Sequence, residues 1–219
     1  MPGARFKQMS EDEMRAHRFE SPLAETVIAE ALNAFGSTCT LSMPLTATCP
    51  GAGVYALYYF GSFAPYQLLA IQTRIGGQIP IYVGKAVPVG WRTSRQASLA
   101  STTAGSVCAR LGQHARTIYG ASNLDITDFE CRFMVVAASV VGMIPAIESA
   151  LINKFHPLWN SVVDGFGNHD PGRGRYGQVP SEWDILHPGR SWLARLTNPS
   201  PVTEREIIQR VEAALKFLS

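Results

Sequence analysis

The chain has 219 residues, of which 46% are hydrophobic and 10% aromatic, so it can form one globular domain with a sizeable core and is not a disordered chain. Its formal net charge of +2 favours no class of partner. No apolar run approaches the ~20 residues that cross a bilayer.

The chain begins with a polar arm. Residues 1–20 are too charged for a signal peptide and predict a loosely held segment. Ser21 and Pro22 then begin a helix whose apolar residues recur at helical spacing as far as Gly36. Residues 37–52 are rich in Ser, Thr, Pro and Gly and predict a loop.

Two apolar, β-branched and aromatic runs follow, residues 54–60 and 79–83, and both predict strands. They carry the tripeptides Gly53-Val54-Tyr55 and Tyr82-Val83-Gly84. If the strands pair antiparallel, the two tyrosines project from one face. The sequence between them fits either a further strand or a short helix.

The remaining elements alternate between helices, one strand and loops. A loop rich in Gly, Asp, Asn and Arg is longer than a connection requires, which is typical of function or disorder. The last helix carries a capping box formed by Thr203 and Glu206. In chain order we expect a loop at 86–103, a helix at 107–119, a buried central strand at 129–141, a helix at 145–155, the long loop at 162–188 and a helix at 203–218.

Four cysteines, at positions 39, 49, 108 and 131, show no C-x-x-C spacing. A zinc site is therefore not expected. Reduced thiols in an intracellular protein are the simplest interpretation.

Five polar residues lie within apolar periodic segments: Tyr55, Tyr82, Arg110, His114 and Glu148. Each has an ordinary explanation, since strand tyrosines can cap a core and an acid in a first helical turn complements the helix dipole. Together they supply phenols, a permanent cation, an imidazole and a hard oxygen ligand. This set can cut a phosphodiester, which needs a base, charge stabilisation and a divalent metal.

On these residues the chain resembles the GIY-YIG nucleases. Val replaces Ile in both tripeptides, and the tyrosines lie 27 positions apart, so 61–78 is an insertion into the hairpin of that family. The long additions make the chain most similar to the type II restriction endonucleases of the family. The positions that match the family's site are Tyr55, Tyr82, Lys85, Arg110, His114 (where the family often has Tyr), Glu148 and Asn160.

The resemblance implies an α/β (α+β) fold with a small, mainly antiparallel sheet flanked by helices. We expect a single domain, 1–219, made of an N-terminal arm and helix (1–49), a catalytic core (50–162) and a DNA-contacting loop with a C-terminal helix (163–219). The implied protein is cytoplasmic, bacterial and not bound to a membrane.

The implied activity is Mg²⁺-dependent hydrolysis of double-stranded DNA at a specific, GC-rich palindromic site of the CCGCGG kind, leaving 5′-phosphate and 3′-hydroxyl ends. A homodimer is implied, since each chain has one active site. The alternatives are a homing or repair nuclease that nicks one strand, and a DNA-binding module on an inactive nuclease scaffold.

In the implied mechanism Tyr55 takes the proton of the attacking water, helped by His114 or Lys85 because a phenol with a pKa near ~10 is a poor base. Arg110 and Tyr82 hold a phosphoryl oxygen. Glu148 is the metal ligand for one Mg²⁺, and Asn160 orients its neighbours.

Basic residues outside this set are candidates for DNA contact. Residues 85–124 contain five Lys or Arg and no acid, which suits a polyanion. The base-contacting or phosphate-contacting candidates are Arg173 and Arg175, flanked by glycines, and then Arg92, Arg95 and Gln96.

Three further patterns have ordinary interpretations. The G-x-G-x-x-G spelling at 172–177 has no strand before it and predicts no dinucleotide site. Asn168-His169-Asp170 fits a loop turn better than a metal site. His156 and His187 are expected to be ordinary hydrogen-bonded residues.

Overall fold

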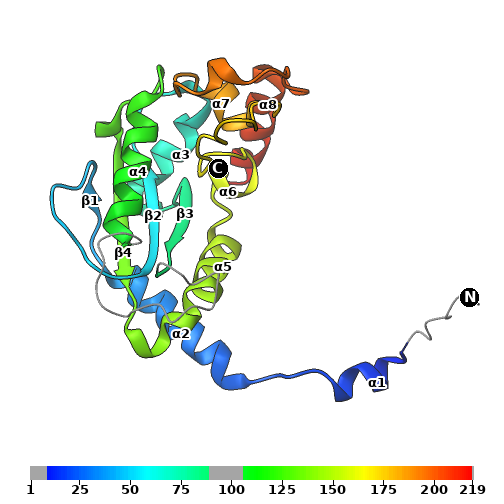
Figure 1. Ribbon diagram of the computed structural model, residues 1–219. Coiled ribbons are helices and arrows are strands. Elements are labelled where there is room, and N and C mark those ends of the chain that lie inside the picture. Colours follow the sequence, from blue (N-terminus) through cyan, green and yellow to red (C-terminus); the bar gives the residue numbers. More distant parts are fainter. Residues whose placement is uncertain (1–8, 89–105, 219) are drawn as a thin grey trace, which may run out of the picture.

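The computed structural model describes residues 9–88 and 106–218, and its centre is an antiparallel sheet (Figure 1). Within these residues the sheet has four strands in the order β1-β4-β2-β3, with helices on both faces, so the expected fold class is confirmed. None of the helices described is both long and apolar enough to cross a membrane. The strands are β1 (Leu41–Ser42), β2 (Gly53–Tyr59), β3 (Tyr82–Ala86) and β4 (Phe129–Val135).

Strand β2 is buried along its whole length because both of its faces are covered. Tyr55, Leu57 and Tyr59 belong to a core that includes residues of helices α4 and α8. Val54, Ala56 and Tyr58 belong to a second core with residues of α2 and α5. The helices that cover the sheet are α2 (Pro22–Ser37), α4 (Val107–Gly120), α5 (Ile144–Phe155) and α8 (Glu204–Leu215).

These four helices confirm the predicted helices to within a few residues. Their ends follow from local chemistry. Pro22 lies in the first turn of α2, and Ser106 accepts a hydrogen bond from the backbone N–H of Ala109 at the start of α4. Thr203 and Glu206 form the predicted capping box of α8, which continues as a 3₁₀ turn, η7 (Lys216–Leu218).

Strand β3 lies later in the chain than the run 79–83 predicts. It begins at Tyr82 because Pro80 has no N–H to give to a ladder. The backbone N–H of Ile81 nevertheless donates to the carbonyl of Leu57 at 2.8 Å, so the segment is already held against β2.

Strand β4 ends at Val135 and not at residue 141. It pairs with β2 from Phe129 to Val135, which is opposite Gly53, the first residue of β2. One more backbone hydrogen bond, from the N–H of Val136 to the carbonyl of Ala52 at 2.9 Å, follows before the two segments separate. The chain then forms a 3₁₀ turn, η5 (Ala138–Met143), before α5. A Cβ on Gly53 would lie 2.0 Å from the carbonyl oxygen of Met134, so the close approach of β2 and β4 requires glycine there.

The insertion at 61–78 is helical, which decides between the two alternatives. Tyr66, Leu69 and Ala70 are buried, so the insertion adds to the core. Its elements are a 3₁₀ turn η1 (Ala64–Tyr66), α3 (Gln67–Gln72) and a π-turn η2 (Thr73–Gly77).

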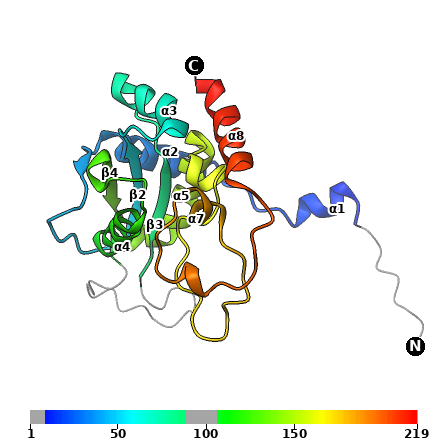
Figure 2. The same cartoon turned by 90° about the horizontal axis from the view of Figure 1, so that it is seen from above.

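The segment 162–188 is not only a loop, and the N-terminal arm is not only extended chain. Trp183 is fully buried within a short helix, and Ser10 with Glu13 forms a capping box on another. Figures 1 and 2 both show this first helix far from the sheet. The short elements are α1 (Glu11–Ala16), η4 (Ile126–Asp128), α6 (Leu158–Ser161), α7 (Glu182–Leu186) and η6 (Leu193–Arg195).

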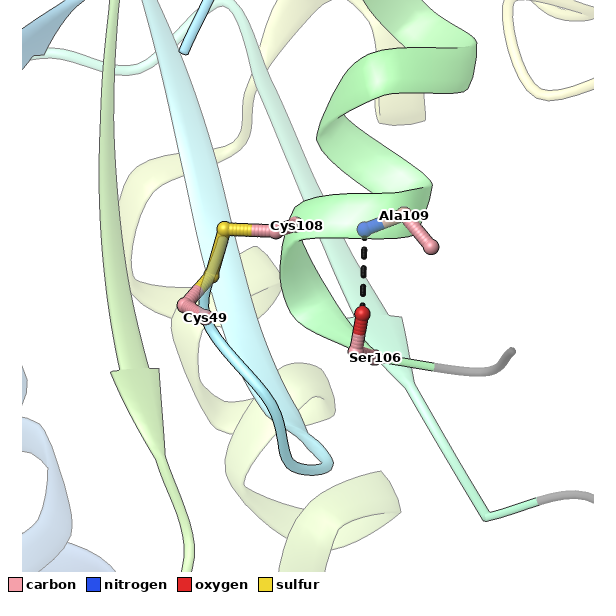
Figure 3. The surroundings of a disulfide bond; sticks show 4 residues. All are labelled: Cys49, Ser106, Cys108 and Ala109. Carbon is pink, nitrogen blue, oxygen red and sulfur yellow. Dashed lines mark hydrogen bonds between the residues drawn. A yellow bond between two sulfur atoms is a disulfide. The ribbon is translucent and has the colours of Figure 1, made fainter. Parts of the chain in front are cut away.

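Two of the four cysteines are joined, so the expectation of reduced thiols is wrong for Cys49 and Cys108. Their disulfide ties the loop before β2 to the first turn of α4, beside the cap at Ser106 (Figure 3). Cys39 is a free, exposed thiol and Cys131 a free, buried one. The bond links positions 59 residues apart, which no short spacing reveals.

Candidate active site

The two tyrosines of the tripeptides lie on one face of the β2–β3 pair. Tyr55 is opposite Gly84 and Leu57 is opposite Tyr82, so the phenols are diagonal neighbours with ring centroids 6.4 Å apart. The hydroxyl of Tyr55 lies 2.7 Å from Nε2 of His114, which comes from α4. The predicted antiparallel pairing therefore brings both phenols to one imidazole.

Gly84 makes room for this arrangement. A Cβ at position 84 would lie 2.6 Å from the hydroxyl oxygen of Tyr55 and 2.7 Å from the nearest carbon of its ring. The side chain of Tyr55 thus crosses the neighbouring strand where that strand has no side chain. Gly84 of the second tripeptide therefore leaves the space that Tyr55 of the first tripeptide occupies.

Burial keeps both phenols protonated. The pKa of Tyr55 is raised above its usual value mainly by burial and then by Tyr82, while Arg110 opposes the shift. Burial likewise raises the pKa of Tyr82, against Arg110, and the charge of Glu148 raises it further. The carboxylate on α5 and the guanidinium on α4 therefore both act on these phenols.

His114 is a neutral imidazole enclosed by aromatic rings. Burial is the main cause that lowers its pKa to about 3, and the positive charge of Arg110 contributes. Phe166 stacks on it at 4.7 Å with the ring planes 19° apart, and the ring of Tyr82 is 5.1 Å away. Because it is uncharged, His114 can accept a hydrogen bond from Tyr55 through Nε2.

Arg110 lies one helical turn before His114, as the i, i+4 spacing predicts. Its Nη1 donates to Oε1 of Gln113 at 2.7 Å and to Nε2 of His169 at 3.2 Å. These two partners occupy one nitrogen of the guanidinium. The guanidinium also interacts with the phenol of Tyr55 by a side-chain hydrogen bond, and an anion near the phenols can accept from these same N–H groups.

Lys85 and Glu148 form an ion pair at the edge strand. Lys85 is opposite Val54, so it projects from the other face of β3 than Gly84 does. Its ammonium group contacts the carboxylate of Glu148, whose side chain is only 15% exposed. The carboxylate of Glu148 thus already binds one cationic group. Among the side chains of this site, Glu148 is the one that could bind a metal ion.

The described residues contain no group of three or more His, Cys, Asp and Glu side chains able to hold a metal. A metal at Glu148 would have a single carboxylate ligand from the chain, with water and substrate oxygens completing its shell. That coordination suits Mg²⁺, which keeps several waters in sites of this kind.

The side chain of Asn160 binds the backbone of β3 and does not contact the phenols. Its Oδ1 accepts the backbone N–H of Val83 at 2.8 Å and its Nδ2 donates to the carbonyl of Val83 at 2.9 Å. The amide thereby pairs with the free edge of β3, between Tyr82 and Gly84. It fixes the strand that carries the second tripeptide.

The structure places some of the expected DNA-contacting residues and not others. Arg173 and Arg175 are exposed in the segment between α6 and α7. Arg92, Arg95 and Gln96 lie outside the described residues.

Three neighbours of the site were not among the sequence-based candidates: Gln113, Phe166 and His169. Gln113 could have been found from its position three residues after Arg110 on the same helix. The sequence around His169 predicts a loop turn, and no spacing connects His169 with α4. Phe166 is an ordinary core aromatic by sequence.

The sheet, the two tripeptides and the His, Arg and Glu side chains gathered at its edge define a nuclease of the GIY-YIG class. A family model described as the Eco29kI GIY-YIG domain matches residues 47–215. The chain belongs to this family, which is a family of restriction endonucleases. No curated protein gives a match to the chain.

Proposed function

We propose that the chain is a type II restriction endonuclease that hydrolyses both strands of DNA at a specific site in the presence of Mg²⁺. The observation that supports this most is the single cluster in which Tyr55 contacts His114 while Arg110 and Glu148 act electrostatically on the phenols. The cluster contains a proton acceptor, an anion-binding cation and a carboxylate within one edge of one sheet.

Tyr55 and His114 together are the proposed proton acceptor. Water attacks phosphorus and passes a proton to the phenol oxygen of Tyr55, while the phenol proton moves to Nε2 of His114. Tyr55 alone is a poor base, because its pKa is raised by burial. Neutral His114 relieves that difficulty, and the negative phosphates of bound DNA would raise its pKa by offsetting the charge of Arg110. Lys85, the alternative helper, is engaged with Glu148.

Arg110 and Tyr82 are the proposed partners of the non-bridging oxygens. Gln113 and His169 hold Nη1 of Arg110, so its remaining N–H groups can face a phosphoryl oxygen. The phenol of Tyr82 remains a donor because burial raises its pKa. Donors placed in advance stabilise the charge that develops on these oxygens in the transition state.

Glu148 is the proposed ligand of one Mg²⁺, which supplies charge stabilisation for the departing 3′-oxygen. When a metal ion binds, it would either replace the ammonium group of Lys85 at the carboxylate of Glu148 or share that carboxylate with it. The bond between phosphorus and the 3′-oxygen breaks, leaving a 5′-phosphate and a 3′-hydroxyl.

Sequence recognition is assigned to the additions around the core. Arg173 and Arg175 are exposed and can reach base edges or phosphates. We propose a GC-rich palindromic site read by a homodimer, since two chains related by a two-fold axis present two active sites to the two strands.

The test is digestion of a long, fully sequenced DNA by the purified chain, with Mg²⁺ and with EDTA. Discrete fragments that require Mg²⁺ are expected, and sequencing their ends gives the site, the stagger and the end chemistry. Nicks would favour a homing or repair nuclease. Binding without cleavage would favour an inactive DNA-binding module, and either result would contradict the proposal.

A further inference from the structure

A groove lies beside the candidate active site, between α4 and two segments of the chain's last third. Its volume is about 590 Å³. We call it the α4 groove. It is lined by Gln113, Arg116, Thr117 and Gly120 of α4, by residues 168–170 and by residues 189–192.

The α4 groove begins at the catalytic cluster. Gln113 and His169 line it, and both hold Nη1 of Arg110. Since a guanidinium only donates, His169 accepts through Nε2 and is neutral, in keeping with a pKa that burial and then Arg110 lower. A ligand in the groove therefore lies next to the arginine proposed to hold the reacting phosphate.

The wall formed by α4 is one continuous helical face. Its lining residues recur at i, i+3, i+4 and i+7 from Gln113 to Gly120, which is about 10 Å along the axis. Three nucleotides of one DNA strand rise by about the same length. Beside Gly120 the segment that forms the opposite wall packs closely on α4, since a Cβ on Gly189 would lie 1.9 Å from the carbonyl oxygen of Gly120.

The charged side chains of the α4 groove differ in how they are engaged. Arg190 is buried, pairs with Asp184 at 3.1 Å and donates to the carbonyl of Phe166. Asp170 pairs with Arg195 at 3.2 Å, which compensates its negative charge.

Arg116 is exposed, and among the described residues no ion pair includes it. Hydrogen-bond donors from Gln113, Thr117, Asn168 and Ser191 share the lining with it. One available cation among neutral donors is chemistry that recognises a phosphodiester.

We propose that the α4 groove binds the backbone phosphates of one DNA strand next to the scissile phosphodiester, with Arg116 as its phosphate-binding cation. This inference rests on the proposed nuclease function. Arg116 sets affinity, and the groove sets the direction in which the strand leaves Arg110. The α4 groove does not distinguish one DNA sequence from another, because the phosphates are the same at every base pair.

The test compares Arg116→Gln with Arg205→Gln, which removes the same charge from an exposed position of α8. Binding of a short fluorescent duplex is measured by anisotropy at several salt concentrations, with Ca²⁺ in place of Mg²⁺ to prevent cleavage. We expect Arg116→Gln to bind about tenfold more weakly, the effect of one charge-assisted hydrogen bond. The slope of log K against log salt should fall by about 0.9.

One further variant and a cleavage measurement separate the possible causes. Arg116→Lys keeps the charge and should recover most of the affinity, whereas Arg205→Gln should bind as the unmodified chain does. In cleavage assays Arg116→Gln should raise KM by about the same factor as it weakens binding. If the unmodified chain binds and cuts DNA, but Arg116→Gln and Arg205→Gln have the same affinity and salt slope, the groove inference is overturned and the proposed function is not. An unmodified chain that neither binds nor cuts DNA would overturn the proposed function as well.

Discussion

The hydroxyl of Tyr55 lies 2.7 Å from Nε2 of His114, although the residues are 59 positions apart and come from a strand and a helix. Both side chains are buried, with exposed fractions of 0% and 3%. A neutral imidazole in contact with a protonated phenol can take the phenol's proton without separating charge over a distance. This pair is the basis for the proton transfer proposed for the chain.

Replacing Glu148 by Gln should abolish cleavage while leaving DNA binding in Ca²⁺ unchanged. The amide keeps the size of the carboxylate but loses its charge, and so loses its affinity for a hard cation. Calorimetric titration with Mn²⁺ should show one site in the unmodified chain and none in the variant. Full cleavage by Glu148→Gln would remove Glu148 as the metal ligand.

Lowering the pH should destabilise the fold already at pH values higher than those at which carboxylates titrate. The pKa values of His114 and His187 are each lowered to about 3, mainly by burial, against about 6.5 in the unfolded chain. The unfolded state therefore binds protons first, and the stability present above pH ~6.5 is lost as the pH falls toward 3.

Urea unfolding between about pH 7 and about pH 5 measures this effect, because few carboxylates titrate in that window. Each histidine can contribute up to about 1.4 kcal/mol per pH unit to the slope of the unfolding free energy. Replacing His187, whose Nδ1 and Nε2 contact Asn123 and Tyr66, should reduce the slope. A free energy of unfolding that stays constant over this window would contradict buried neutral imidazoles.

Substituting Gly84 by Ala should displace the ring of Tyr55 and lose activity. The added Cβ would lie 2.6 Å from the hydroxyl oxygen of Tyr55. We expect a loss of about 1–3 kcal/mol in unfolding free energy, typical of overpacking, and a cleavage rate lower by on the order of 10²-fold.

Gly112→Ala is the matched control for this substitution. Gly112 is in the interior of α4, and the nearest atom to its added Cβ, Nη1 of Arg116, is 3.9 Å away. This variant should gain about 0.5–1 kcal/mol in stability, because alanine favours a helix over glycine. Similar effects of the two substitutions would refute the proposed role of Gly84.

Reducing the disulfide between Cys49 and Cys108 should lower the stability of the chain. Closure of a loop between cysteines 59 positions apart corresponds to about 4 kcal/mol in the chain-entropy model. Thermal unfolding with and without dithiothreitol measures the loss. Cys39→Ser, at an exposed free thiol, should behave as the unmodified chain does. An identical Tm with and without reductant would show that the bond does not contribute.

The sequence was sufficient to predict the pairing at the centre of the site. Alternation along two strands, together with antiparallel pairing, places Tyr55 and Tyr82 on one face, and helical spacing places Arg110 beside His114. These relations depend on neighbours within one element or one hairpin. The long insertion between the tyrosines did not disturb them, because it folds as helices outside the hairpin.

Contacts between distant segments could not be predicted in the same way. His169 lies 59 positions from Arg110, and Arg190 ties the chain near it by pairing with Asp184 and donating to the carbonyl of Gly165. The cysteine pair likewise depends on where the loop before β2 meets α4. Local propensity also predicts the wrong strand end where pairing with the neighbouring strand decides the boundary, as at Val135.

The most direct test of the account compares single-turnover DNA cleavage by Tyr55→Phe and Tyr66→Phe. Both substitutions remove a buried phenol oxygen that lies 2.7 Å from a histidine Nε2, since Tyr66 contacts His187 as Tyr55 contacts His114. Tyr66 also accepts from Trp159, so its loss should cost about 1–3 kcal/mol of stability.

We predict that Tyr55→Phe stays folded, binds DNA and cleaves on the order of 10²–10⁴-fold more slowly, as expected when a general base is removed. Tyr66→Phe, assayed below its melting temperature, should cleave at nearly the unmodified rate. Cleavage by Tyr55→Phe that matches the unmodified chain would contradict the assignment of Tyr55 and His114 as the reaction centre.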